Sequence, residues 1–129
     1  MWKHLITICV LTLFVSVNVL AENIKKIEVY GNKRISKETI QVLSDLKKED
    51  NFNDLSLNTA LKKLYETDFF SDIKITFVDG ILKLNVVENP IIEKITINGI
   101  KKKTFVENIY SSISLKDRTS FTDYKLKKD

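Results

Sequence analysis

The fold of this chain is decided by the segment Ile73-Lys-Ile-Thr-Phe-Val-Asp-Gly-Ile-Leu-Lys-Leu-Asn-Val86. Apolar and polar residues alternate on both sides of Asp79-Gly80, a dipeptide typical of two-residue type I′ hairpin turns. Such a turn sets the cross-strand pairs, which are Val78 with Ile81, Phe77 with Leu82, Ile75 with Leu84 and Ile73 with Val86. A slip of one residue would bury Lys83 and Asn85 in place of the apolar residues, so the register is well specified. The segment therefore predicts an antiparallel hairpin with one apolar face.

A short strand and two amphipathic helices are predicted before the hairpin. Residues 24–30 alternate as a strand does and run into the turn residues Gly31-Asn32. Ser36 predicts the N-cap of a first helix, whose last turn would hold Lys47-Lys48. Asn53 or Asp54 begins a second helix, whose apolar residues at helical spacing are Leu57, Ala60, Leu61, Leu64 and Tyr65. The order strand–helix–helix–strand–strand predicts an α+β module, with a three-stranded mixed sheet packed on two helices.

The opening of this module recurs 68 positions further along the chain. Ile24-Lys-Lys-Ile-Glu-Val-Tyr-Gly31 returns as Ile92-Glu-Lys-Ile-Thr-Ile-Asn-Gly99, again as a strand pattern that ends in glycine. Self-similarity at a fixed period is typical of modular arrays. A first helix is predicted from Phe105, Ile109 and Ile113, and residues 121–129 would open a second one. We therefore expect one module at 22–89 and the start of a second copy at 90–129, which is incomplete and should not fold stably by itself.

Residues 1–21 have the pattern of a secretory signal peptide. Lys3 gives a short positive start, residues 5–19 are mostly apolar, and Val19-Leu-Ala21 places small residues where signal peptidase cleaves. The apolar run is shorter than the roughly 20 residues that span a bilayer. We expect cleavage before Glu22 and export of the chain; a retained membrane anchor is the alternative.

Composition narrows the chemistry available to the exported chain. Its single cysteine and single histidine, Cys9 and His4, both lie in the expected signal peptide. Their removal excludes disulfides, zinc sites of the usual ligand types, and Cys–His or Ser–His–Asp nucleophiles. We expect no enzyme activity, no catalytic residues, no metal and no cofactor, although a carboxylate-pair or Ser–Lys enzyme stays formally open. The net charge of +4 is modest, and export argues against a nucleic-acid partner.

Three motifs in order then resemble a known family. They are Ile27-Glu-Val-Tyr-Gly-Asn32 with Arg34-Ile35, then Leu64-Tyr-Glu-Thr-Asp-Phe-Phe-Ser-Asp-Ile73, then Val87-Glu-Asn-Pro-Ile91. With the repeat, they resemble the polypeptide-transport-associated (POTRA) domains of BamA-type outer-membrane assembly factors. Two positions depart from the pattern. Asp68 stands where the family has a glycine with positive φ after a helix, and Ile100 stands where the first copy has Asn32.

The resemblance implies a periplasmic arm in front of an outer-membrane β-barrel, with the barrel beyond this chain. Such arms bind unfolded outer-membrane proteins and accessory assembly lipoproteins, for folding and insertion into the cell outer membrane. POTRA modules also occur in two-partner-secretion and translocation barrel transporters and in cell-division proteins. An exported α+β enzyme is a further alternative, of a different class.

The family topology places the third strand in the centre of the sheet and the second strand at an edge. The outward N–H and C=O groups of an edge strand are unpaired, so an extended chain can add to it by β-augmentation. The predicted peptide-binding residues are Asp72, Ile73, Lys74, Ile75, Thr76, Phe77 and Val78. The alternative is a solvated edge guarded by Lys74. We interpret Lys101-Lys102-Lys103 as a solvated loop.

Overall fold

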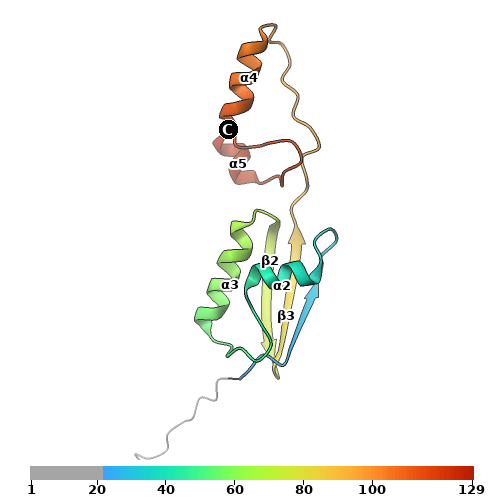
Figure 1. Ribbon diagram of the computed structural model, residues 1–129, viewed down its shortest axis with the longest axis vertical. Helices are drawn as coiled ribbons and strands as arrows, with labels where there is room; N and C mark the ends of the chain where they lie inside the picture. The colour runs from blue at the N-terminus through green and yellow to red at the C-terminus, as the bar shows by residue number, and fades with distance from the viewer. Residues whose placement is uncertain (1–21) are drawn as a thin grey trace, which may run out of the picture.

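The computed structural model describes residues 22–129, so the predicted signal peptide lies outside the described residues (Figure 1). The elements are β1 (Lys26–Tyr30), α2 (Lys37–Ser44), α3 (Asp54–Glu66), β2 (Phe70–Val78), β3 (Ile81–Glu88), α4 (Lys103–Ser112) and α5 (Asp123–Lys128). Among the described residues, no helix has the length and apolar character needed to cross a membrane.

The sheet has the predicted mixed topology, in the order β1-β3-β2. β1 lies parallel to the central strand β3, and β2 pairs with β3 in the antiparallel sense. The predicted hairpin register is confirmed, from Val78 opposite Ile81 to Ile73 opposite Val86. Figure 1 shows α2 and α3 over one face of this sheet, with α2 packed against β1 and α3 against β2. The result is the expected two-layer α+β module.

The core lies between this sheet and the helix pair. Its fully buried side chains come from each of these layers and are Ile24, Ile40, Leu64, Leu82 and Leu84. Phe77 is only partly buried at the margin of the core, where its ring stacks on Phe52 with the centroids 4.3 Å apart. The alternation that predicted the hairpin thus also selects the residues that fill the core.

Helix α2 begins as predicted but ends earlier. The Ser36 side chain accepts the N–H of Thr39, as an N-cap does. Asp45 then takes a left-handed conformation (φ 57°), and the helix ends at Ser44. The prediction that Lys47-Lys48 occupy the last helical turn is therefore wrong. Leu46 is 5 % exposed, and the chain leaves the helix early to bring this side chain into the core.

The second copy repeats the backbone hydrogen bonds that fasten the start of the first. In the first copy these bonds are Ile24 N–H to Asp50 O, Glu49 N–H to Ile24 O, and Phe52 N–H to Glu22 O. In the second copy they are Ile92 N–H to Thr119 O, Arg118 N–H to Ile92 O, and Phe121 N–H to Pro90 O. The isolated bridge between Asn23 and Asn51 likewise recurs between Ile91 and Ser120. The sequence repeat therefore has a counterpart in the structure.

The strand expected within residues 91–98 is not formed. Among the described residues, this segment has only the isolated bridge at Ile91. A strand forms only when it pairs with a neighbouring strand. Within residues 22–129, no segment forms a ladder with this stretch as β3 does with β1. The helix predicted from Phe105 and Ile109 is present as α4, and Ile113 is its C-cap residue.

We expect Leu64→Ala to lower the free energy of unfolding by roughly 2–5 kcal/mol, because the fully buried Leu64 side chain leaves a cavity between α3 and the sheet. The matched control is Leu55→Ala on the same helix, where the side chain is 77 % exposed; its loss should stay within about 0.5 kcal/mol. Urea unfolding of residues 22–129 measures both. Equal losses would show that the facing of α3 is wrong.

Candidate functional site

The predicted peptide-binding residues form one continuous edge, strand β2. The two-residue turn makes Val78 and Ile81 a hydrogen-bonded pair, and the pairs then alternate along an antiparallel ladder. Val78, Thr76 and Lys74 therefore direct their backbone N–H and C=O groups toward β3. Those of Ile73, Ile75 and Phe77 point away from the sheet, toward the open edge.

One outward group of this edge is already occupied. The N–H of Ile73 donates to the Tyr65 hydroxyl of α3 at 3.1 Å, which agrees with the outward direction set by the register. A register shift between Phe70 and Asp72 interrupts the ladder next to it. The open part of the edge therefore centres on Ile75 and Phe77. Sequence reasoning treated Tyr65 only as an apolar position of its helix and missed this contact.

The two faces of the edge differ in character. Ile73 is buried, and Ile75 and Phe77 are half-buried on the side covered by the helices. On the other side Asp72, Lys74 and Val78 are exposed and Thr76 is half-buried. A chain that pairs with β2 would therefore meet an apolar margin on one side and a polar surface on the other.

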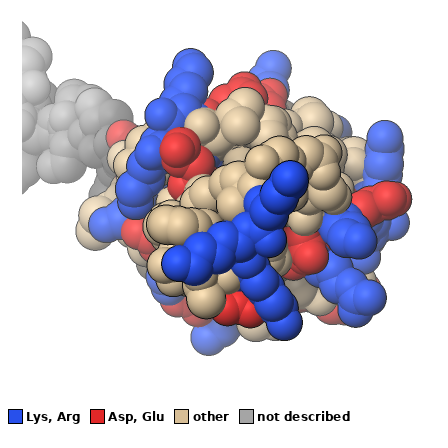
Figure 2. Space-filling model, turned by 90° about the horizontal axis from the view of Figure 1, so that it is seen from above, with Lys and Arg blue, Asp and Glu red and all other residues tan. Residues whose placement is uncertain are grey.

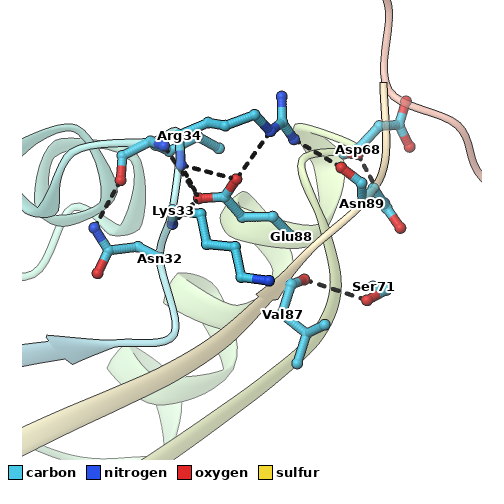
Figure 3. Close-up of polar contacts among 9 residues, drawn as sticks. Asn32, Lys33, Arg34, Asp68, Ser71, Val87, Glu88 and Asn89 are labelled. Carbon is cyan, nitrogen blue, oxygen red and sulfur yellow. Dashed lines mark hydrogen bonds and ion pairs between the residues drawn. The ribbon is translucent and has the colours of Figure 1, made fainter. Parts of the chain in front are cut away.

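A buried carboxylate lies at the end of the sheet opposite the hairpin turn (Figure 3). Glu88, at the end of β3, accepts the backbone N–H groups of Lys33, Arg34 and Ile35 at 2.7, 3.0 and 3.1 Å. The Arg34 Nε lies 3.1 Å from the same carboxylate, whose side chain is only 4 % exposed. The loop between β1 and α2 is thus wrapped around one anion. Burial would raise the pKa of Glu88, but the three N–H donors and the guanidinium outweigh it and hold this pKa below its ordinary value.

The three sequence motifs meet at this carboxylate. Arg34 Nη2 donates to Asn89 O at 2.7 Å, and Asn89 Nδ2 donates to Asp68 O at 2.8 Å. Asp68 has φ 59°, so the expectation of a positive φ after α3 is confirmed.

Gly31 has φ +82°, and a Cβ there would lie 2.2 Å from Val86 O. Only glycine allows β1 to turn this close to β3.

The remaining charged groups form no comparable site. Within residues 22–129, no cluster of three or more His, Cys, Asp or Glu residues is placed to hold a metal ion. Figure 2 shows Lys and Arg side chains interspersed with carboxylates on the face seen from above. Lys101, Lys102 and Lys103 are exposed, and Lys103 pairs with Glu107 on α4, at 3.9 Å.

A family model described as "POTRA: Surface antigen variable number repeat" matches residues 22–89. The chain belongs to the POTRA family. Two curated relatives carry the name "Outer membrane protein assembly factor BamA". The protein of Neorickettsia risticii is 30 % identical over 89 residues, which is 69 % of this chain and 12 % of that protein. The protein of Neisseria meningitidis serogroup B is 36 % identical over 78 residues, 60 % of this chain and 10 % of that protein.

The chain spans about a tenth of the length of these two POTRA relatives. A solved structure, "POTRA1-3 of the periplasmic domain of Omp85 from Anabaena", is similar with a TM-score of 0.49 and 11 % identity. The similar region covers 81 % of this chain and 46 % of that one. The resemblance to BamA-type POTRA domains that the motifs predicted is confirmed by the family match and the two relatives.

We expect Glu88→Gln to destabilise this POTRA module by roughly 1–3 kcal/mol at neutral pH, because charge-assisted hydrogen bonds to a buried carboxylate are lost. The folded-state pKa of Glu88 is lowered, so its contribution is present above the unfolded pKa and is lost as the pH falls through the folded value. Urea unfolding at about pH 7 and about pH 3 should therefore show the difference from wild type shrinking in acid.

The control for this pH series is Glu66→Gln, where the side chain is 63 % exposed and pairs with Lys62 at 3.8 Å. Its effect should be small at both pH values. A Glu88→Gln difference that stays constant from neutral to acidic pH would contradict the role given to the Glu88 charge.

Proposed function

We propose that this chain is a periplasmic, strand-capturing part of an outer-membrane protein assembly factor. The observation that carries the proposal is the edge strand β2, whose outward main-chain groups at Ile75 and Phe77 lie beside an apolar margin. The names of the two curated relatives support the assembly role. The clients would be unfolded outer-membrane proteins, which add to β2 as an extra strand.

The chemistry of the edge suits such clients. Strands of outer-membrane barrels alternate apolar and polar side chains with a period of two. A segment of this kind on β2 would place its apolar residues beside Phe52 and Phe77, and its polar residues beside Lys74 and Thr76. The main-chain hydrogen bonds depend little on client sequence, so one edge would serve many clients.

The open edge is short, which favours transient binding. Tyr65 occupies the Ile73 N–H and leaves Ile75 and Phe77 as the outward donors of the paired region. A net hydrogen bond contributes roughly 0.5–1.5 kcal/mol, so a few of them give only weak affinity. Weak capture allows a client to be released for the next step of assembly.

The wider setting is part of the same proposal. Residues 1–21 would direct export, the described chain would act in the periplasm without enzyme activity or cofactor, and a barrel elsewhere in the protein would anchor it in the outer membrane. Accessory assembly lipoproteins would be further partners. The hydrogen bonds shared by 22–52 and 90–121 support the interpretation of 90–129 as the start of a second POTRA module.

The test compares how tightly the wild-type chain and an Ile75→Pro variant bind a peptide that corresponds to one barrel strand. Binding is measured from the changes in amide chemical shifts as the peptide is added. Proline removes an outward N–H while leaving the hydrogen bonds to β3 in place, so we expect affinity to fall by about tenfold or more. Ile75→Val keeps the donor and is the matched control; Lys74→Ala should also change little. Equal affinity of the proline and valine variants would refute capture at β2.

A further inference from the structure

One dipeptide of the second copy, Asn98-Gly99, combines a reactive sequence with an open backbone. Asn98 is the only asparagine of the chain that is followed by glycine. Both residues are exposed, and they lie in the stretch after Ile91 where residues 22–129 form no strand. Gly99 has φ +85°, and a Cβ placed there would meet nothing within 4 Å. Within residues 22–129, the Gly99 N–H donates to no backbone carbonyl.

This arrangement leaves the main chain free to attack the asparagine side chain. The Gly99 nitrogen loses its proton and bonds to Cγ of Asn98, while the Cγ–Nδ2 bond breaks and Nδ2 leaves as ammonia, taking up one proton. Water then opens the resulting five-membered imide at either of its carbonyl carbons. Opening at Cγ gives aspartate, and opening at the main-chain carbonyl gives isoaspartate, in which the chain continues through Cγ. Glycine favours the attack because it has no Cβ and reaches more main-chain conformations.

The corresponding position of the first copy has a closed backbone. By the repeat of 68 positions, the dipeptide corresponds to Tyr30-Gly31. Tyr30 is the last residue of β1 and is held in the parallel ladder with β3. Gly31 packs so closely on that strand that a Cβ would lie 2.2 Å from Val86 O. An asparagine at position 30 would have to break this ladder before its Cγ could reach the next nitrogen.

We propose that Asn98-Gly99 is a site of spontaneous covalent modification, at which Asn98 becomes aspartate or isoaspartate. The conversion adds a negative charge three positions before the exposed Lys101. Isoaspartate also adds one methylene to the main chain, where the strand pattern of residues 92–98 runs into Gly99. The second copy is thereby altered with time at a place where the first copy, with its tyrosine, is not. The inference goes beyond the proposed function and does not require capture at β2.

The experiment uses the full chain, exported to a bacterial periplasm, purified and kept in neutral buffer. Samples taken over several weeks are digested with trypsin, which releases residues 95–101 as one peptide. Conversion raises the mass of this peptide by about 1 Da. Chromatography separates the aspartate and isoaspartate forms, and an isoaspartate-specific methyltransferase labels the second form. A digest of freshly purified protein measures any conversion during handling.

We expect both products at Asn98, with isoaspartate in excess, to form at least tenfold faster than products at any other asparagine of the folded chain. The same measurement in guanidinium chloride removes the structure. Because the native backbone is already open here, the native rate at Asn98 should lie within about threefold of the rate in denaturant. This comparison needs no variant.

The matched variant is Tyr30→Asn, which creates the same Asn-Gly dipeptide in the paired backbone of the first copy. The Tyr30 side chain is 47 % exposed, so the fold is retained. In the native variant, conversion at position 30 should be at least tenfold slower than at Asn98 in the same sample. In denaturant the two rates should agree within about threefold. Asn98→Gln should remove the mass gain from peptide 95–101.

Three results would overturn the inference. A native rate at Asn98 more than about tenfold below the rate in denaturant would show that the fold protects the dipeptide. Equal native rates at position 98 and at position 30 of Tyr30→Asn would show that the open backbone does not select the site. Aspartate without any isoaspartate would exclude the imide route.

Discussion

The buried carboxylate of Glu88 is the interaction on which the module depends. A parallel pair such as β1 and β3 needs a crossover connection, and here the crossover begins with a tight loop that leaves three consecutive N–H groups without helix or sheet partners. Glu88 accepts all three and binds the Arg34 guanidinium as well. The end of β3 therefore sets the start of α2, and α2 in turn borders a groove along β1.

The residue that follows Glu88 begins the connection between the first module and the second copy. Asn89 donates its N–H to Phe69 O and its side-chain amide to Asp68 O, so the chain leaves β3 fixed against the end of α3. The Asp68 carboxylate then pairs with Lys125 of α5 at 2.6 Å. An aspartate at this position costs some backbone strain relative to glycine but supplies a charge between the two copies. The departure from the family pattern thus has a structural use in this chain.

Local patterns predicted most of the fold. The hairpin register followed from the two-residue turn and the period of two, because both act between neighbours in sequence. The end of α2 did not follow from a local pattern. It is set by the burial of Leu46 in the core and not by Lys47 and Lys48. Tyr65 and Glu88 show that local patterns also failed to predict contacts at the β2 edge and at the buried carboxylate. Both residues belonged to motifs quoted from the sequence, but their roles depend on groups brought near only by the folded chain.

A POTRA module built this way has two open edges of different character. β2 offers outward groups beside an aromatic margin, whereas β1 borders a groove in which apolar residues of β1 and α2 lie among charged residues of both signs. Both edges depend on the central strand β3, which pairs with β1 from Ile81 to Asn85 and with β2 from Ile81 to Glu88. Binding at β2 would extend the sheet without rearranging the core.

Amide hydrogen exchange, followed residue by residue with and without a bound barrel segment, would decide whether β2 acquires a further strand. Strand addition should slow exchange at Ile75 and Phe77, whose N–H groups point outward, and should leave Lys74 and Thr76 nearly unchanged because they already donate to β3. Protection that alternates in this way is the predicted result. No change along β2, or slowing spread evenly over all four residues, would contradict β-augmentation at this edge.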